Sequence, residues 1–242
     1  MTGRFHIVIP ARLASTRLPR KALLDLGGRP VIEHVWRRAL DAGAESVTIA
    51  TDSKEIVSAC EAFDANVMLT SAAHQSGTDR IAEVVKQRGW QDELVVNVQG
   101  DEPFMPPSAI RQVVDLLEQA PQADIATLAT PIEEDSEWHD PDCVKVVTDA
   151  QGFALIFSRA AIPFQRKVAG AARLRHIGIY AYRAASLQRM VAAPACALEQ
   201  TESLEQLRAM WIGQRIIVAE AADKPPPGID NEADLMAARA RI

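Results

Sequence analysis

The first hundred residues alternate between short β-branched runs and longer segments whose apolar residues recur at helical spacing. The β-branched runs fall at 6–9, 46–50, 66–70 and 94–99. The helical segments lie between them, at 30–43, 53–63 and 78–89. Such alternation is typical of βαβ units, so the pattern predicts an α/β fold with a mainly parallel sheet.

From about residue 124 the rhythm changes. Strand-like runs follow one another without full helices between them, at 124–129, 144–149, 152–158 and 176–183. This order predicts antiparallel additions to the sheet, which form a subdomain or a dimer surface. Helical patterns return at 184–192, 198–211 and 231–242. We therefore expect a single domain over 1–242, with a smaller antiparallel or dimerisation portion at about 130–183.

The composition narrows the function classes. The chain of 242 residues has a formal net charge of -6, and a general nucleic-acid binder needs widespread Lys and Arg, so that class is not expected. Three scattered cysteines predict neither a disulfide framework nor a zinc site. No apolar run is long enough for a signal peptide or a membrane span. We expect a cytoplasmic protein without membrane insertion.

A basic loop follows the first strand. The stretch "PARLASTRLPRK" at 10–21 carries four positive charges and no acidic residue. Neither a GxxxxGK[ST] nor a GxGxxG motif is present there, so any phosphate contact would depend on side chains. Arg presents a planar fork of donors to phosphate oxygens, and Lys presents a point charge. The loop therefore binds a small anion or is a solvated basic loop.

Acidic residues follow other predicted strands. Asp101 and Glu102 come directly after the run at 94–99. Since Mg²⁺ prefers one or two carboxylates plus substrate phosphates, they are metal-ligand candidates, or they form a turn before a helix capped by Ser108. Asp230 is a second candidate carboxylate. From its surroundings alone, a role for Asp230 or Asn231 as the N-cap of the last helix is favoured.

Two later segments leave alternatives open. Alternation places four residues on one face of the strand at 176–183, where they meet a hydroxyl-rich ligand or, more commonly, water: His176, Gly178, Tyr180 and Tyr182. Packing explains the apolar residues of 198–211, namely Leu198, Leu204, Leu207 and Trp211. Packing gives no reason for the polar residues Glu205 and Gln206 in this segment. By default, we expect them to lie on a solvated face of the helix. The histidines outside this strand are isolated and receive no role.

Ordered blocks along the chain resemble the 3-deoxy-manno-octulosonate cytidylyltransferase family. They are "IPARLASTRLPRK", "ATDS", "HQSGTDR", "VNVQGDEP", "VKVV", "FSRAAIPF", "RHIGIYAYR", "LEQLRAMW" and "GIDNEADL". The resemblance implies a single cytidylyltransferase domain with a three-layer sheet of the nucleotide-diphospho-sugar transferase type. It also implies a homodimer that uses Mg²⁺ to transfer CMP from CTP to the sugar acid Kdo, for lipopolysaccharide synthesis. A related acid sugar, such as an 8-amino Kdo analogue or sialic acid, and a non-catalytic binding module are the alternatives.

The resemblance also implies roles for individual residues. Those implied to bind the triphosphate are Ala11, Arg12, Ser15, Arg17 and Lys21. Those implied to read cytidine are Ser76, Arg80 and Gln99. Asp101 and Asp230 are implied to bind Mg²⁺, which reverses the preference for a cap at Asp230, and with Arg12, Arg17 and Lys21 they form the implied catalytic set. Those implied to contact the sugar acid are Arg159, His176, Tyr180, Glu205 and Gln206.

Two places depart from the family pattern. The closing block has Asn231 and Glu232 where Thr and Pro are common, which would affect the helix cap more than the metal site. The family commonly has a small residue, often Gly, where this chain has Arg20. If the loop needs a positive φ there, an Arg adds strain to the backbone.

Overall fold

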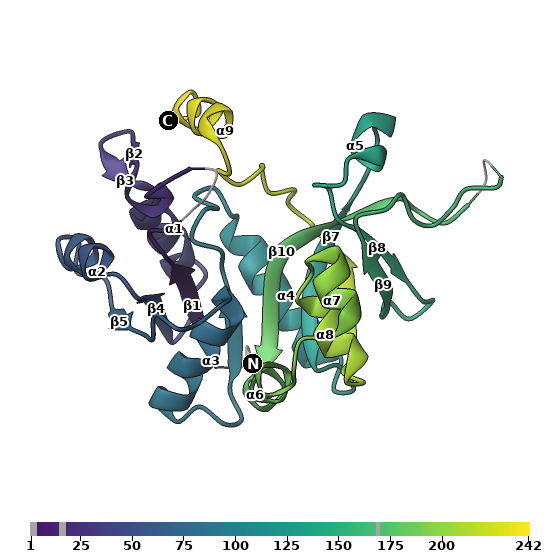
Figure 1. Cartoon of the computed structure of the whole chain (residues 1–242), viewed down its shortest axis with the longest axis horizontal. Helices are drawn as coiled ribbons and strands as arrows, with labels where there is room; N and C mark the ends of the chain where they lie inside the picture. The colour runs from purple at the N-terminus through teal and green to yellow at the C-terminus, as the bar shows by residue number, and fades with distance from the viewer. Residues whose placement is uncertain (1–3, 15–17, 168–169) are drawn as a thin grey trace.

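The centre of the molecule is a mixed β-sheet (Figure 1). The computed structural model describes residues 4–14, 18–167 and 170–242. Its first strands pair in parallel, with β1 next to both β4 and β6. They are β1 (Phe5–Ala11), β4 (Ser46–Thr51), β5 (Val67–Leu69) and β6 (Leu94–Asn97). The predicted βαβ units are therefore confirmed.

The second half of the chain adds both parallel and antiparallel strands. Strand β10 (Leu174–Arg183) runs antiparallel to β6 and to β7 (Ile125–Pro131), and β11 (Ile216–Glu220) runs parallel to β7. The resulting order is β11-β7-β10-β6-β1-β4-β5, in which β10 is the reversed strand. A hairpin of β8 (Lys145–Thr148) and β9 (Ala154–Ser158) pairs with the start of β10.

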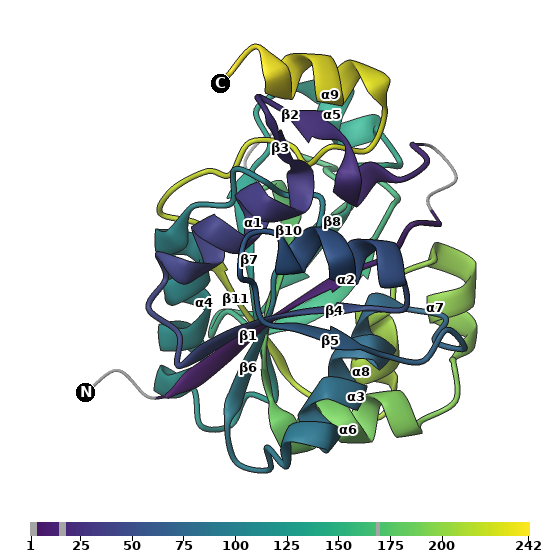
Figure 2. The same cartoon turned by 90° about the vertical axis from the view of Figure 1, so that its left-hand side faces the viewer.

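Helices cover both faces of this sheet, as the two views show (Figures 1 and 2). One face packs against α1 (Val31–Leu40), α2 (Lys54–Glu61) and α4 (Pro107–Gln119). The other packs against α3 (Gly77–Arg88), α6 (Ala184–Ala192) and α8 (Gln206–Trp211). Two hydrophobic cores result, which confirms the three-layer α/β fold.

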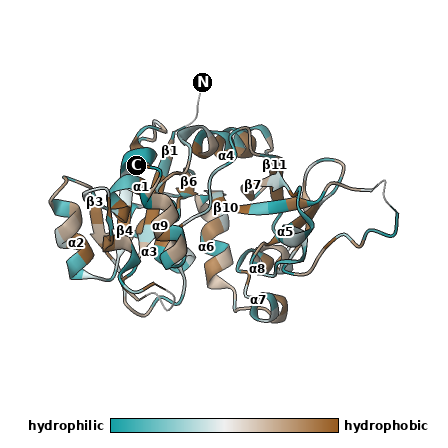
Figure 3. Cartoon of the chain, turned by 90° about the horizontal axis from the view of Figure 1, so that it is seen from above, coloured by the Kyte–Doolittle hydropathy of each residue, from teal (hydrophilic) through white to brown (hydrophobic). Residues whose placement is uncertain are grey.

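Strand β1 shows how the sequence produces two cores. Phe5, Ile7 and Ile9 belong to the core under α1 and α4, whereas Val8 belongs to the core under α3 and α6. Successive side chains of a strand point to opposite faces, so a strand buried on both faces needs a continuous apolar run. In Figure 3, hydrophobic and hydrophilic positions alternate on the surrounding helices, as expected for helices with one buried face.

A small third core joins the segment after the basic loop to the C-terminal segment. It lies between the β2–β3 hairpin (Asp25–Leu26 and Arg29–Pro30) and α9 (Glu232–Arg239). Its members are Leu18, Leu26, Val31, Ile229, Leu235 and Ala238. The short helix η1 (Lys21–Leu23) precedes the hairpin, so this core supports the end of the basic loop.

The remaining helices lie beside the antiparallel strands. Helix α5 (Asp135–His139) follows β7, and α7 (Ala197–Glu202) precedes α8. The sequence pattern predicted one helix over 198–211, but Ser203 has a φ of 53° and separates α7 from α8. A left-handed residue cannot continue a right-handed helix, so the chain turns there. No helix in the described ranges is long and apolar enough to cross a membrane.

Two smaller expectations were wrong. Ser108 does not cap α4, because the helix begins at Pro107 and the Ser108 hydroxyl binds Asp223 instead. Trp211, expected to be packed, is 63% exposed, and Leu198 is 44% exposed. Neither of these apolar side chains is buried by the described residues of the chain.

Candidate active site

Loops at the carboxyl ends of β1 and β6, together with the start of α3, enclose two adjoining cavities. Gly77 and Gln99 line both of them. The first cavity has a volume of about 280 Å³ and the second of about 240 Å³. Ligands of open parallel sheets bind at this edge, where the strand ends meet their loops.

The first cavity gathers residues that the sequence predicted for nucleotide and metal binding. They are Ala11, Arg12, Lys21, Ser76, Arg80, Gln99, Asp101 and Asp230. Ser15 and Arg17, from the same predicted set, lie outside the described residues. The three separate loops that carried these residues in the sequence therefore share one cavity with the C-terminal segment.

Gly100 permits the close approach of the β1 and β6 ends. A Cβ atom at this position would lie 2.8 Å from the carbonyl oxygen of Pro10. That distance is shorter than real Cβ contacts allow, so a side chain at 100 would push the two loops apart. Gly100 thereby places Gln99 and Asp101 next to the basic loop.

Lys21 links the two carboxylates that were predicted to bind Mg²⁺. Its Nζ lies 2.5 Å from Asp101 Oδ2 and 3.1 Å from Asp230 Oδ1. The three side chains come from η1, the end of β6 and the segment before α9, and Lys21 and Asp230 are 209 positions apart. The ammonium group of Lys21 thus neutralises part of the negative charge of Asp101 and Asp230.

The neighbouring Asn231 explains why Asp230 is available for this contact. Asn231 Oδ1 accepts a hydrogen bond from the backbone N–H of Asp234 at 3.0 Å and so caps α9. The Asp234 carboxylate in turn accepts the backbone N–H of Asn231 at 3.1 Å. The cap favoured from the local sequence is therefore at Asn231, while the Asp230 carboxylate faces Lys21.

Glu102 adds a third carboxyl group beside this pair. Its Oε2 is buried and has no hydrogen-bond partner among the described residues. Burial, followed by the charges of Asp101 and Asp230, raises the pKa of Glu102 to about 8. Near pH 7 the Glu102 carboxyl group is therefore largely protonated, because it is buried and Asp101 and Asp230 already place negative charge beside it. Across the described ranges, no cluster of three His, Cys, Asp or Glu residues has the spacing of a preformed metal site.

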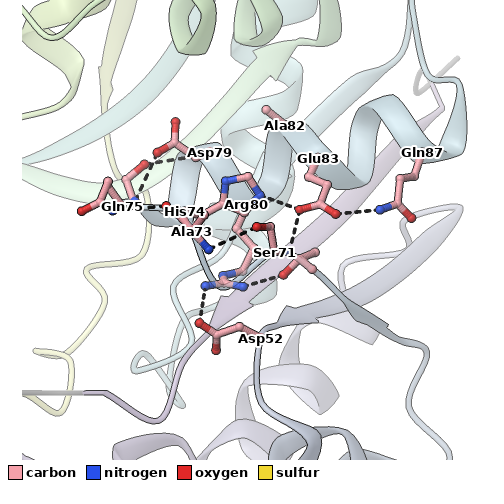
Figure 4. A network of polar contacts seen from close by, with 12 residues as sticks. Asp52, Ser71, Ala73, His74, Gln75, Asp79, Arg80, Ala82, Glu83 and Gln87 are labelled. Carbon is pink, nitrogen blue, oxygen red and sulfur yellow. Dashed lines mark hydrogen bonds and ion pairs between the residues drawn. The ribbon is translucent and has the colours of Figure 1, made fainter.

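Arg80, labelled in Figure 4, and Ser76 are each held by contacts of their own. The Arg80 guanidinium is 3% exposed and donates to Asp52 Oδ2 at 3.0 Å and to the Thr70 hydroxyl. The Ser76 hydroxyl accepts the backbone N–H of Asp79 at 3.1 Å, which caps α3. Both residues therefore line the cavity from fixed positions on α3.

His74 was given no role from the sequence, yet it lines the first cavity. Its Nε2 lies 2.5 Å from Glu83 Oε2, which also accepts the backbone N–H of Ser71 at 2.9 Å (Figure 4). Burial opposes ionisation of Glu83, but the hydrogen bonds from Ser71 and His74 lower its pKa. The nine-residue spacing from the loop to the second turn of α3 gave no recognisable signal in the sequence.

The second cavity brings together four of the five residues expected to contact a sugar acid. They are His176, Tyr180, Glu205 and Gln206. Arg159 lines neither cavity; its Nε donates to the Glu202 carbonyl at 2.7 Å and its Nη1 to the Pro141 carbonyl at 2.9 Å. The turn at Ser203 places Glu205 and Gln206 at the start of α8, facing this cavity.

The polar face of β10 does not face water. Tyr180 is 8% exposed and Tyr182 is 3% exposed, and both belong to the core beneath α3 and α6. Burial lowers the pKa of His176 to about 3, so its imidazole is neutral near pH 7 and lies 3.0 Å from the Thr127 hydroxyl. The solvent-facing interpretation of this strand was therefore wrong.

Glu205 occupies a similarly secluded position. The Thr78 hydroxyl, from the first turn of α3, donates to its Oε2. Burial raises the pKa of Glu205, although the hydrogen bond from Thr78 opposes that shift. The expectation that Glu205 lies on a solvated helix face was therefore wrong.

Comparison with known proteins agrees with this geometry. A model of the cytidylyltransferase family matches residues 6–216. The 3-deoxy-manno-octulosonate cytidylyltransferase of Yersinia enterocolitica is 52% identical, over 98% of this chain and 97% of its own length. That of Pseudomonas syringae is 50% identical over 97% of this chain and 96% of its own length. The chain belongs to the 3-deoxy-manno-octulosonate cytidylyltransferase family.

A solved structure extends the match to three dimensions. The structure titled CMP:2-keto-3-deoxy-manno-octonic acid synthetase complexed with CTP superposes with a TM-score of 0.93 at 41% identity. The match covers 98% of each chain. This member of the 3-deoxy-manno-octulosonate cytidylyltransferase family therefore has the family's α/β fold and is a nucleotidyltransferase.

Arg20 stands where the resemblance led us to expect a small residue. It adopts φ 60° and ψ 23°, so the loop does require a left-handed residue there. Arg20 Nη1 donates to Glu55 Oε2 at 3.1 Å, and Nη2 donates to the other carboxylate oxygen. This exposed ion pair offsets part of the strain that a non-glycine residue has in the left-handed region.

Proposed function

We propose that this protein transfers CMP from CTP to 3-deoxy-D-manno-octulosonate (Kdo), which yields CMP-Kdo and pyrophosphate. The observation that carries the proposal is the pair of adjoining cavities that share Gln99. The first has cationic and carboxylate side chains suited to a nucleoside triphosphate. The second has the hydroxyl, amide and carboxyl groups that suit a hydroxyl-rich acid.

The reaction is an in-line displacement at the α-phosphorus of CTP. The oxygen of the anomeric hydroxyl of Kdo forms a bond to that phosphorus as the bond to the β-phosphate oxygen breaks. The hydroxyl proton is lost to solvent, and pyrophosphate leaves with the electron pair of the broken bond. Such transfers depend on positioning and charge stabilisation more than on covalent help from the protein.

The cationic residues of the first cavity stabilise the leaving group. Arg12 and Lys21 line the cavity and supply positive charge toward the β- and γ-phosphates. Arg17 is expected to assist from the same basic loop. Ser76, Arg80 and Gln99, near the start of α3 and the end of β6, bind the cytidine portion and so orient the α-phosphate toward the second cavity.

The acidic groups of the first cavity fit a Mg²⁺ ion. Asp101 and Asp230 converge within 3.1 Å of Lys21 Nζ, so two carboxylates meet a single ammonium group and leave an excess of negative charge. Two carboxylates plus substrate phosphates are the ligands Mg²⁺ prefers, so Asp101 and Asp230 would hold it. When bound, the ion supplies charge neutralisation at the phosphates.

Assembly and location complete the proposal. The β9 strand and the segment after it expose apolar residues, with Phe164 88% exposed and Leu155 59% exposed. We propose that this antiparallel portion forms the contact between two copies in a homodimer. The buried free cysteines Cys60, Cys143 and Cys196 fit a reducing compartment, which supports the cytoplasm. The product would enter lipopolysaccharide synthesis.

Pyrophosphate release tests the proposal. The protein is incubated with Kdo and Mg²⁺ and with each of CTP, ATP, GTP and UTP in turn. We expect release with CTP that depends on both Kdo and Mg²⁺. Equal rates with all four nucleotides would contradict the cytidine assignment, and saturable binding of CTP without release would favour a non-catalytic module.

The acid sugar is tested in the same assay. Kdo, 8-amino Kdo and sialic acid compete for one limiting supply of CTP, and the products are separated. We expect CMP-Kdo to dominate. Dominance of another product would assign the protein to that sugar while leaving the transfer of CMP intact.

A further inference from the structure

Asn97 is a polar residue at a position that the sheet otherwise reserves for the core. It is the last residue of β6, and alternation places it on the same face as Val95, which belongs to the core beneath α3 and α6. The side chain is 2% exposed and lines the second cavity. An apolar residue at position 97 would continue the core, so the burial of a polar amide there requires an explanation.

The carbonyl oxygen of this amide has no partner among the described residues. Asn97 Oδ1 is fully buried and accepts no hydrogen bond in the described part of the chain. An unsatisfied buried acceptor lowers the stability of the folded state, and native proteins seldom retain one without a compensating role. The amide nitrogen is accounted for, because it interacts with the Tyr182 hydroxyl. That contact explains why the side chain is held but leaves the oxygen unexplained.

The surroundings indicate which ligand group would satisfy it. Asn97 pairs with Tyr180 across the β6–β10 ladder, and both line the cavity with Glu205 and Gln206. An Asn carbonyl oxygen is an acceptor, so the missing partner must be a donor. The volume of about 240 Å³ is roughly that of eight water molecules at about 30 Å³ each, which leaves room for a small polar molecule.

We propose that Asn97 is a specificity-determining residue whose Oδ1 accepts a hydrogen bond from one hydroxyl group of the acid sugar. The inference rests on the proposed function, because it takes the second cavity as the sugar site. A sugar carboxylate has no proton to donate at neutral pH, so the partner is a hydroxyl. A site built around a substrate hydroxyl rejects the analogue that lacks it, because the buried protein group is then left unpaired.

The consequence is a selective loss of discrimination. In the wild-type protein, removal of the recognised hydroxyl from the sugar leaves Asn97 Oδ1 buried without a partner. In Asn97→Leu, a side chain of similar size without the acceptor, the same removal has little further effect. Asn97→Asp keeps an acceptor at this position and is expected to keep the discrimination, whatever its effect on overall rate.

The test uses Kdo and a panel of analogues that each lack one hydroxyl. We expect one analogue to lower wild-type kcat/KM by about 10- to 100-fold, and to lower that of Asn97→Leu by less than about threefold. The KM for CTP should stay within about twofold of wild type in Asn97→Leu, since the first cavity is unchanged. Asn66→Leu, which removes an exposed amide bonded to Thr48, is the matched control and should behave as wild type.

Two outcomes would overturn the role of Asn97. One is that Asn97→Leu discriminates among the analogues as the wild type does. The other is that its KM for CTP rises as much as its KM for Kdo, which indicates a structural role. Asn97→Val, whose β-branched side chain suits a strand, repeats the test if Asn97→Leu does not fold. A wild-type protein that releases no pyrophosphate from CTP and Kdo would overturn the proposed function and this inference together.

Discussion

The two cavities differ in how their polar groups are stabilised before a ligand binds. In the first, opposite charges pair with one another: Lys21 with two carboxylates, and Arg80 with Asp52. In the second, the groups are buried and are not paired with opposite charges among the described residues that line the cavity. His176 has a pKa of about 3, burial raises the pKa of Glu205, and Asn97 Oδ1 has no partner among the described residues.

This difference implies two ways of binding. A ligand in the first cavity must exchange existing ion pairs for new ones. Its affinity is therefore the difference between the free energy of the pairs that are lost and that of the pairs that form, and a single change of charge alters this difference. A ligand in the second enters a site that packing has already shaped, so less order is lost on binding. Charge substitutions should therefore act on turnover in the first cavity and on sugar affinity in the second.

The largest effect is expected for Asp101→Asn. Loss of one of the two candidate Mg²⁺ ligands should lower kcat by at least about 10²-fold, because the amide keeps the shape and removes the charge. The measurement is pyrophosphate release at saturating CTP and Kdo, with circular dichroism as a check on the fold. Asp92→Asn, an exposed carboxylate before β6, is the control. Activity within twofold of wild type would remove Asp101 from the metal site.

His176 should make the second cavity sensitive to acid. Its pKa is about 6.5 unfolded and about 3 folded, so below pH 6.5 the unfolded state binds a proton that the folded state does not. Stability is therefore full above pH 6.5 and falls as the pH drops toward 3. Between pH 7 and pH 5 this group should remove about 2 kcal/mol from the free energy of unfolding.

Urea denaturation at the two pH values checks this expectation. His176→Gln lacks the titrating ring, so its stability should decline less over the same range by about 2 kcal/mol. His139→Gln, on the exposed helix α5, should decline as the wild type does. Equal declines for wild type and His176→Gln would show that the ring does not remain neutral in the folded protein.

Glu205→Gln should affect the sugar and spare the nucleotide. The substitution keeps the size of the side chain but replaces a carboxyl group that accepts the Thr78 hydroxyl. We expect the KM for Kdo to rise by about tenfold, the effect of losing one hydrogen bond to a charged group, while the KM for CTP changes by less than about twofold. Steady-state kinetics with each substrate varied in turn gives both values. A rise shared equally by both would erase the proposed division between the cavities.

The smallest effect is expected at Arg20, which precedes η1 and lies outside the lining of both cavities. Arg20→Gly relieves the left-handed strain but loses the ion pair with Glu55, so the free energy of unfolding should change by less than about 1 kcal/mol. Arg20→Ala loses the ion pair and keeps the strain, so it should be less stable than Arg20→Gly by about 1 kcal/mol. Paired urea denaturation measures both variants, and turnover should remain within twofold of wild type. Equal stability of the two variants would mean that a non-glycine residue at position 20 carries no backbone strain.

The sequence was most informative where hydrophobic periodicity and strand-end loops decide the structure. The βαβ units follow from alternating patterns, and the meeting of 10–21, Gln99 and Asp101 follows from parallel strands ending at one edge. The contact between Lys21 and Asp230 was not predictable in this way, because it depends on the third core, which only the folded chain creates.

Other features were hidden because local patterns do not encode them. Ser203 divides a stretch whose apolar spacing suits one helix, and a serine carries no strong signal for a positive φ. The contact of His74 with Glu83 joins a loop to a helix across nine residues. Asn97 interrupts an otherwise apolar run, and its importance becomes visible only when the cavity beneath it is known.

The third core also has a consequence for synthesis on the ribosome. Lys21 emerges 209 residues before its partner Asp230, and the α9 residues that complete the third core emerge later still. Domains tend to fold from the N-terminus as they are made, so the sheet and its helices can form while the first cavity still lacks one of its two candidate metal carboxylates. The first cavity is therefore among the last parts of this protein to be completed during synthesis.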